Sequence, residues 1–145
     1  MGRVLTLVKN NSNSVRVYGI AYRIKSDDMK KTFDDLNFRE KCGYSLKEID
    51  FYPNDNQSEP FKCVCYFANE ENVYYSPNNN INEMAQQIFE TVGPSGTNKE
   101  YLFNFCDSLR HIATCINDDK ILIYDYHLFE LEKLVKNLDV TTIYN

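Results

Sequence analysis

The segment INEMAQQIFETVGPSGTNKEYLF, residues 81–103, contains two helix signals separated by a turn. Apolar residues in its first half recur at the spacing of an amphipathic helix, at Ile81, Met84, Ala85, Ile88, Phe89 and Val92. Gly93-Pro94 ends this periodicity, because Gly and Pro are common just after the C-terminus of a helix. Thr97 and Glu100 then form a capping box, which predicts that a second helix begins there. Its apolar face continues at Tyr101, Leu102, Phe105, Leu109 and Ile112.

Upstream of this segment the sequence is typical of strands. Residues 2–8 and 14–24 are rich in β-branched and aromatic side chains, and the KNNSNS between them has a turn composition, so they are predicted to form a β-hairpin. Residues 44–52 and 61–68 read as a second pair of strands, joined by the turn-rich PNDNQSEP. The sheet therefore has four candidate strands.

Two further helices are predicted, one on each side of the central segment. Ser26 is the expected N-cap of a short helix that runs to about Phe38. The last helix has an apolar stripe at Leu128, Leu131, Leu134, Val135 and Leu138. Its exposed side is predicted to carry Glu130, Glu132, Lys133 and Lys136, and the tail after Asp139 is predicted to fray. Residues 113–126 include the apolar run ILIY, for which an added strand and a surface loop are both open.

The order of elements predicts an α+β domain, with a mostly antiparallel sheet or partial barrel flanked by helices. No composition shift marks a linker, so one domain is expected over residues 1–145. The net charge of −5 argues against nucleic-acid binding, which requires clustered Lys and Arg. No apolar run is long enough to span a membrane, and a cytoplasmic protein is expected. The five cysteines lack paired CxxC spacings, so reduced thiols without a metal site are expected.

The stretch LNFREKCGYS places a carboxylate, Glu40, between a predicted helix and a predicted strand. Its neighbours Phe38 and Tyr44 could desolvate this carboxylate and raise its pKa, which is the property that a general base needs near neutral pH. The alternative is that Glu40 pairs with Arg39 or Lys41 in solvent, as charged residues at helix ends usually do. Taken by itself, this stretch favours the alternative.

The turn Gly93–Gly96 leaves two interpretations open. Its backbone N–H groups could bind an anion such as a peptide carboxylate, because they precede a helix N-terminus. The turn could equally connect two helices, and its composition favours this second interpretation. Tyr101, just inside the following helix, could donate a hydrogen bond to a ligand or could be an ordinary buried tyrosine.

Several segments together resemble the ChaC-type γ-glutamylcyclotransferases, the enzymes that cleave glutathione. They are GRVLTLV, VYGIAYRI, LNFREKCGY, FYPND, INEMAQQIFETVGPSGTNKEYLF and HLFELEKLVKNL, and they extend over nearly the whole chain. The resemblance implies a γ-glutamylcyclotransferase-like fold and a cofactor-independent lyase that acts on glutathione. It assigns the acid/base role to Glu40, within the matching REK-x-GY stretch, and Tyr44 and Tyr101 are the candidate substrate-binding residues.

Two features depart from the family pattern. The family's glycine-rich Tyr-Gly-Ser-Leu loop is absent, so the chain is expected to be N-terminally truncated relative to the family. The connection over residues 113–126 is also longer than usual. In the family, the backbone of the missing loop holds the γ-glutamyl group, which leaves an alternative open. Under that alternative the chain is a catalytically inactive remnant of the fold that binds a peptide or protein.

Overall fold

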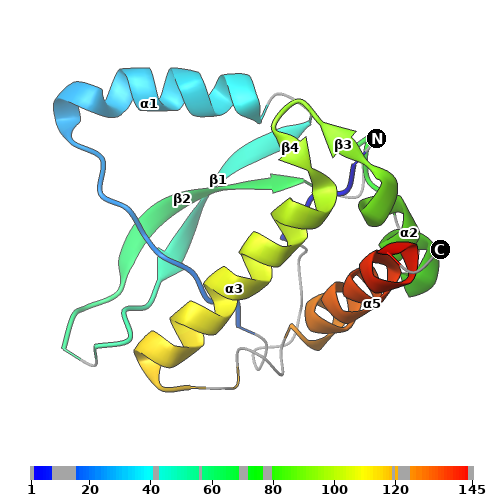
Figure 1. Cartoon of the computed structure of the whole chain (residues 1–145). Coiled ribbons are helices and arrows are strands. Elements are labelled where there is room, and N and C mark those ends of the chain that lie inside the picture. The colour runs from blue at the N-terminus through cyan, green and yellow to red at the C-terminus, as the bar shows by residue number, and fades with distance from the viewer. Residues whose placement is uncertain are drawn as a thin grey trace. The chain divides into compact units, whose positions relative to one another are not determined.

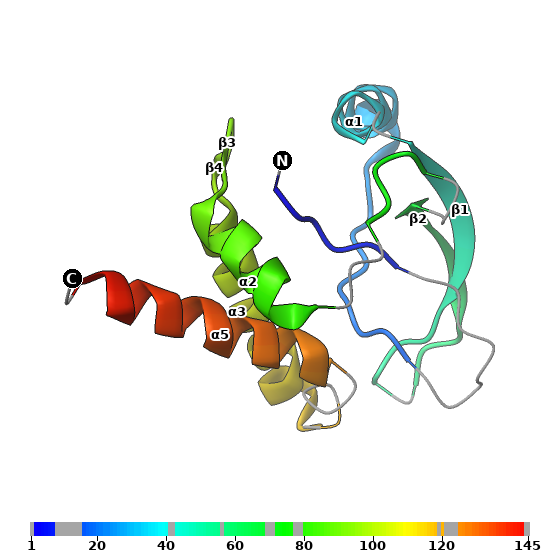
Figure 2. The same ribbon diagram turned by 90° about the vertical axis from the view of Figure 1, so that its right-hand side faces the viewer.

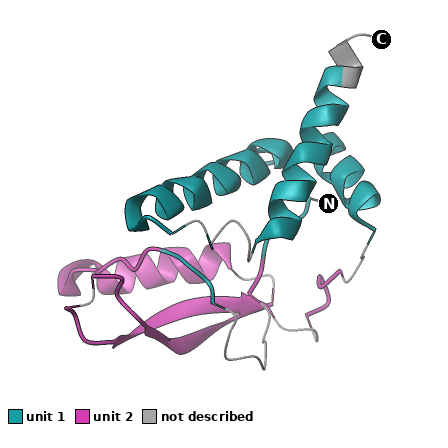
Figure 3. Cartoon of the chain, turned by 90° about the horizontal axis from the view of Figure 1, so that it is seen from below, with its two compact units in different colours: residues 1–5, 12–19, 77–145 teal, residues 6–11, 20–76 magenta. Residues whose placement is uncertain are grey.

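The chain is described by a computed structural model that covers most of its length. The described residues are 2–7, 16–40, 43–55, 57–68, 72–76, 80–118, 120 and 125–143. They form two compact units (Figure 3). Unit 1 comprises residues 1–5, 12–19 and 77–145, and unit 2 comprises residues 6–11 and 20–76. The expectation of one domain over residues 1–145 stays a prediction.

Unit 1 is built around three helices, α2 (Ile81–Glu90), α3 (Asn98–Ile116) and α5 (Tyr126–Ile143) (Figure 1). Their apolar faces meet in one core, and the predicted helical periodicity accounts for nearly all of its members. The buried residues are Met84, Ala85, Ile88, Leu102, Cys106, Leu109, Ala113, Leu128, Leu131 and Val135. Burial of the Val, Leu, Ile and Met side chains among them stabilises a domain by about 1.5–3 kcal/mol each relative to exposure.

A short hairpin joins α2 to α3. β3 (Val92–Gly93) pairs antiparallel with β4 (Gly96–Thr97), and Gly96 has a φ of 124°, a conformation that favours glycine. The predicted capping box is confirmed, because Thr97 Oγ1 accepts from the Glu100 N–H while Glu100 Oε2 accepts from the Thr97 N–H. Helix α2 ends at Glu90, whereas its predicted apolar stripe extended two residues further, to Val92. The helix ends earlier because Val92 belongs to the hairpin.

The last helix departs from its prediction in two ways. Glu132, predicted to be exposed, is only 3% exposed, because Arg110 of α3 and Lys136 of α5 both donate hydrogen bonds to its carboxylate. The helix also continues to Ile143, beyond the fraying expected after Asp139, and Asp139 accepts a hydrogen bond from Lys99 at 2.7 Å. A buried carboxylate held by two cations thus links α3 to α5. The ILIY run at 121–124 lies outside the described residues.

The N-terminal segment contacts the start of α3, and its described residues form no strand. Residues 2–7 and 16–24 have no regular secondary structure, so the predicted hairpin of 2–8 and 14–24 is wrong over its described part. In place of a strand partner, the Asn98 carboxamide accepts from the Arg3 N–H at 2.6 Å and donates to the Arg3 carbonyl at 2.7 Å. A Cβ at Gly2 would lie 3.0 Å from Asn98 Oδ1, so this close approach favours glycine.

Unit 2 contains α1 (Ser26–Arg39) and the antiparallel hairpin of β1 (Tyr44–Phe51) and β2 (Phe61–Ala68) (Figure 2). The predicted helix and strand pair are confirmed. The N-cap residue is Lys25, however, and not the predicted Ser26. Tyr66 donates a hydrogen bond to the Asn37 carboxamide oxygen at 2.6 Å, which ties β2 to α1. The sheets of the described residues are this hairpin and β3–β4, and with the helices they confirm the α+β class.

The β1–β2 hairpin has one largely apolar face. The register runs from Tyr44 opposite Ala68 to Phe51 opposite Phe61, so alternate residues share a face. On one of these faces the rings of Phe51 and Phe61 lie 5.1 Å apart, and Cys63 and Cys65 follow along β2. Both cysteines are half-buried. Among the described residues of unit 2, Ala68 is the single buried hydrophobic residue, so the described part of this unit has no core comparable to that of unit 1.

The Asn98 contact predicts a measurable loss of stability on mutation, because one carboxamide makes two hydrogen bonds to the backbone of Arg3. Asn98→Ala removes the two part-buried hydrogen bonds to the Arg3 N–H and carbonyl, and at about 0.5–1.5 kcal/mol for each hydrogen bond the pair contributes about 1–3 kcal/mol. We expect urea denaturation, followed by far-UV circular dichroism, to show a loss of that size. Asn104→Ala, an exposed change on the same helix, should alter the unfolding free energy by less than about 0.5 kcal/mol. Equal effects of the two substitutions would contradict the assignment.

Glu132 predicts an acid-sensitive contact in unit 1. Burial raises the pKa of Glu132, but the hydrogen bonds and charges of Arg110 and Lys136 outweigh burial and lower it below its ordinary value of 4.5. The stabilisation is therefore complete above that value and is lost as the pH falls through the folded-state pKa. We expect Glu132→Gln to flatten the decrease of unfolding free energy with falling pH, measured by urea denaturation. Glu130→Gln on the same helix is the matched control, and an unaltered slope in Glu132→Gln would refute the prediction.

Candidate active site

Glu40 stands where α1 ends. It is the C-cap residue of the helix, with φ −92° and ψ 17°, and its N–H donates to the Leu36 carbonyl at 2.8 Å. This conformation lies in the sparsely populated bridge region, where many active-site residues sit. The side chain is half-buried, whereas the preceding Arg39 is exposed. The backbone of α1 therefore fixes the position from which the carboxylate projects.

The carboxylate of Glu40 makes no hydrogen bond or ion pair with any described residue. The predicted alternative of a pair with Arg39 is therefore not formed in the structure. Lys41, the other proposed partner, lies outside the described residues. A half-buried carboxylate that no described cation neutralises can exchange a proton with a ligand, which is what a general acid/base requires.

Gly43 directly precedes Tyr44 and has a left-handed backbone conformation. Gly43 has a φ of 84°, and a Cβ at this position would lie 2.8 Å from the Asn72 side chain. Any other residue would meet both a backbone penalty and a steric clash. Tyr44 then begins β1 opposite Ala68 and is half-buried. The structure thus places Glu40 and Tyr44 in the same unit, at the end of a helix and the start of the next strand.

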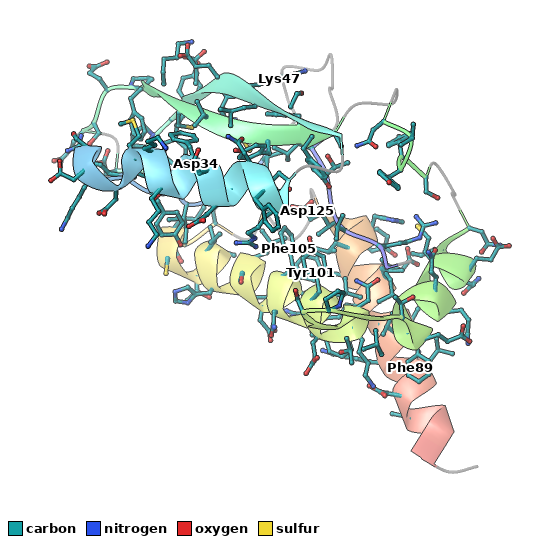
Figure 4. All side chains as sticks on the ribbon, turned by 90° about the horizontal axis from the view of Figure 1, so that it is seen from above. Asp34, Lys47, Phe89, Tyr101, Phe105 and Asp125 are labelled. Carbon is teal, nitrogen blue, oxygen red and sulfur yellow. The ribbon has the colours of Figure 1, made fainter. Side chains whose placement is uncertain are left out.

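Tyr101 lies in unit 1, in the first turns of α3 (Figure 4). Its side chain is 39% exposed, so the alternative of an ordinary buried tyrosine is wrong. The hydroxyl oxygen accepts a hydrogen bond from the Leu5 N–H at 3.3 Å, and its ring is 6.5 Å from that of Phe105 one turn later. Because the oxygen acts as the acceptor in this contact, the O–H proton can be donated to another group.

The Gly93–Gly96 turn is a connector in the structure. The backbone N–H groups that follow it already have partners within the chain. Thr97 donates to the Glu100 carboxylate at 3.1 Å, Asn98 to the Thr91 carbonyl at 2.9 Å and Glu100 to Thr97 Oγ1 at 3.2 Å. The hydrogen bonds from Thr97 lower the pKa of Glu100, which keeps this cap ionised. These contacts favour the connector, which the composition also favoured, over the alternative of an anion site.

Sequence reasoning missed a polar cluster next to Tyr101. Asn98 anchors Arg3, and Arg3 Nε in turn donates to Gln87 Oε1 of α2 at 2.7 Å. The cluster and the hydroxyl of Tyr101 together hold residues 3–5 against α2 and α3. Helical periodicity marks Asn98 as an ordinary first-turn residue, and only its partner, 95 positions away, gives it a role. A single sequence holds no local signal for such a contact.

Two findings bear on the predicted absence of a metal and of a membrane span. In the part of the chain that the structure describes, no three or more His, Cys, Asp or Glu side chains gather in a way that could hold a metal ion. None of the described helices has the length and apolar character needed to cross a membrane. The expectation that the chain uses no cofactor stays a prediction.

The chain is similar in sequence to several curated enzymes. It is 32% identical over 133 residues to glutathione-specific gamma-glutamylcyclotransferase 1 of Danio rerio, covering 90% of this chain and 63% of that enzyme. The human enzyme of the same name is 34% identical over 122 residues, covering 83% of this chain and 54% of the relative. Gamma-glutamylcyclotransferase 2-3 of Arabidopsis thaliana is 32% identical over 128 residues, covering 83% and 59%. The chain therefore spans between half and two thirds of the length of these relatives.

The fold has a counterpart among solved structures. The crystal structure of the yeast gamma-glutamyl cyclotransferase specific to glutathione superposes with a TM-score of 0.58, at 21% sequence identity. The match covers 79% of this chain and 58% of the yeast chain, and it supports the predicted γ-glutamylcyclotransferase-like fold. A profile of the family described as ChaC-like protein matches residues 1–138. With nearly the whole chain matched, the sequence belongs to the ChaC-like protein family.

Proposed function

We propose that the chain cleaves glutathione by cyclising its γ-glutamyl group to 5-oxoproline and releasing Cys-Gly. The observation that carries the proposal is the half-buried Glu40 carboxylate at the end of α1, without an ionic partner among the described residues. It lies in the REK-x-GY stretch that resembles the catalytic stretch of the ChaC-type enzymes. The similarity to enzymes named as glutathione-specific cyclotransferases supports the choice of substrate.

The reaction needs one well-placed proton carrier. Glu40 takes a proton from the α-ammonium of the γ-glutamyl group, which frees the nitrogen lone pair to attack the γ-carbonyl carbon of the same group. A five-membered ring closes as the new C–N bond forms. The amide bond to cysteine then breaks, and Glu40 returns its proton to the departing amine. The nitrogen that attacked still carries a second proton, which it loses as the lactam N–H forms and which the released amine takes up to become the ammonium of Cys-Gly. Protons and charge then balance, and the carboxylate is regenerated.

Orientation supplies much of the rate in this scheme. The nucleophile and the electrophile belong to one molecule, and holding them in a reactive geometry can contribute about 7–11 kcal/mol in favourable intramolecular systems. Tyr44 follows Glu40 by one glycine turn and is proposed to contact the γ-glutamyl group. Tyr101 is proposed to donate its O–H to the substrate while its oxygen accepts from Leu5. Both residues would therefore contribute binding and orientation.

The cellular setting follows from the substrate class. Reduced glutathione is abundant where thiols stay reduced, and the described cysteines are all free. This agrees with the cytoplasmic location expected from the sequence, which we include in the proposal. Glutathione is the proposed partner molecule. Other γ-glutamyl amines share the reacting atoms and differ in the leaving group, so kinetics with each amine compared side by side would define the substrate range.

Glu40→Gln tests the catalytic assignment. The amide cannot carry the proton, and loss of general acid/base catalysis lowers kcat by about 10² to 10⁴-fold. Release of Cys-Gly from glutathione, measured by chromatography, should fall accordingly. Glu48→Gln on β1 is the matched control in the same unit and should keep the wild-type rate. If Glu40→Gln folds and is as active as the wild type, Glu40 is not the catalyst.

An inactive but folded wild-type chain would contradict the enzyme proposal itself. Calorimetry would then test the alternative that the chain is a catalytically inactive binding module. Binding of a peptide without release of Cys-Gly would support a catalytically inactive binding module of the same fold.

Tyr101→Phe tests the proposed substrate contact. Removal of one hydroxyl that binds the ground state and the transition state equally raises KM and leaves kcat unchanged. A hydrogen bond worth about 1 kcal/mol corresponds to a roughly fivefold increase in KM for glutathione. Tyr126→Phe, at an exposed position of α5, should leave both constants unchanged. Equal KM values for wild type and Tyr101→Phe would remove Tyr101 from the site.

A further inference from the structure

The described thiols differ sharply in accessibility. Cys106 is fully buried in the core of unit 1, and burial raises its pKa to about 12. Cys63 and Cys65 are half-buried on β2, and burial also raises the pKa of Cys65. Cys115 alone among the described cysteines is exposed. Thiol chemistry depends on access to the sulfur and on the formation of thiolate, so solvent access favours Cys115 over the other three.

Cys115 also has a base within reach. His111 precedes it by one helical turn on α3, and its Nε2 lies 3.5 Å from Cys115 Sγ. Both side chains are exposed. A cysteine hydrogen-bonded to an imidazole is a nucleophile paired with a general base, because the imidazole can take the thiol proton as the sulfur attacks. The pair belongs to unit 1 and shares no residue with the proposed catalytic stretch around Glu40 and Tyr44.

We propose that Cys115, assisted by His111, is a site of thiol–disulfide exchange with low-molecular-weight disulfides such as glutathione disulfide. The Cys115 sulfur transfers its proton to His111 Nε2 and attacks one sulfur of the disulfide. An S–S bond to Cys115 forms while the original S–S bond breaks. The released thiolate takes the proton back from His111. Cys115 is oxidised and the leaving sulfur is reduced, so the step needs no reactant beyond the disulfide.

The exchange uses side chains that have no role in the proposed cleavage of glutathione. A glutathionyl group on Cys115 would place two carboxylates at the C-terminal end of α3, beside the left-handed cap residue Asn117. The inference is independent of the proposed function, because it requires neither Glu40 nor turnover of glutathione. An inactive chain would still carry the same pair of side chains.

The test follows modification of the intact chain by glutathione disulfide. The reduced protein is incubated with glutathione disulfide, and the adduct is measured by intact mass and located by peptide mapping. We expect one glutathionyl group on Cys115 and none in Cys115→Ser. Cys63→Ser should react like the wild type. An adduct on any other cysteine of the wild type, including one outside the described residues, would overturn the assignment.

The contribution of His111 is measured by rate. A hydrogen bond worth up to about 1.5 kcal/mol corresponds to an initial rate about tenfold lower in His111→Asn. His127→Asn, at an exposed histidine of α5, is the matched control and should keep the wild-type rate. Glu40→Gln should also react normally, which separates this site from the proposed catalytic one. An unchanged rate in folded His111→Asn would overturn the role of His111 as base.

Discussion

The double hydrogen bond between the Asn98 carboxamide and the backbone of Arg3 is the constraint on which the position of the N-terminal segment in unit 1 depends. One side chain at the start of α3 satisfies a donor and an acceptor of a segment that has no strand partner among the described residues. Gly2 permits the close approach, and Arg3 reaches on to Gln87 of α2. Since buried backbone groups must find partners, this contact keeps the segment in place without a sheet. It also sets the position from which the Leu5 N–H meets Tyr101.

In the described part of unit 2, backbone geometry and not a hydrophobic core positions the candidate catalyst, Glu40. Glu40 caps α1, Gly43 turns the chain through a left-handed conformation, and Tyr44 opens β1. The described part of this unit buries a single hydrophobic side chain, so hydrogen bonds such as that between Tyr66 and Asn37 carry more of its organisation. The end of α1 fixes the backbone of Glu40, and its half-buried carboxylate has no ion-pair partner among the described residues. That combination suits a residue that must accept and return a proton.

The sequence predicted the parts of the fold that depend on neighbours along the chain. The periodicity of α2, α3 and α5 and the Thr97 capping box are local patterns, and the structure confirms them. The failures involve partners far apart in sequence. Residues 2–8 have a strand composition, but a strand forms only where another strand lies beside it. Glu132 has the spacing of an exposed residue, and its burial depends in part on Arg110, which lies 22 positions away in the sequence.

We propose that the chain closes a ring within its substrate and does not hydrolyse the γ-glutamyl bond. The most direct measurement is the identity of the acidic product, followed by NMR during incubation of the purified chain with glutathione. Intramolecular attack predicts 5-oxoproline in a one-to-one ratio with Cys-Gly and without free glutamate. Free glutamate as the first product would contradict the account, because it requires water as the nucleophile.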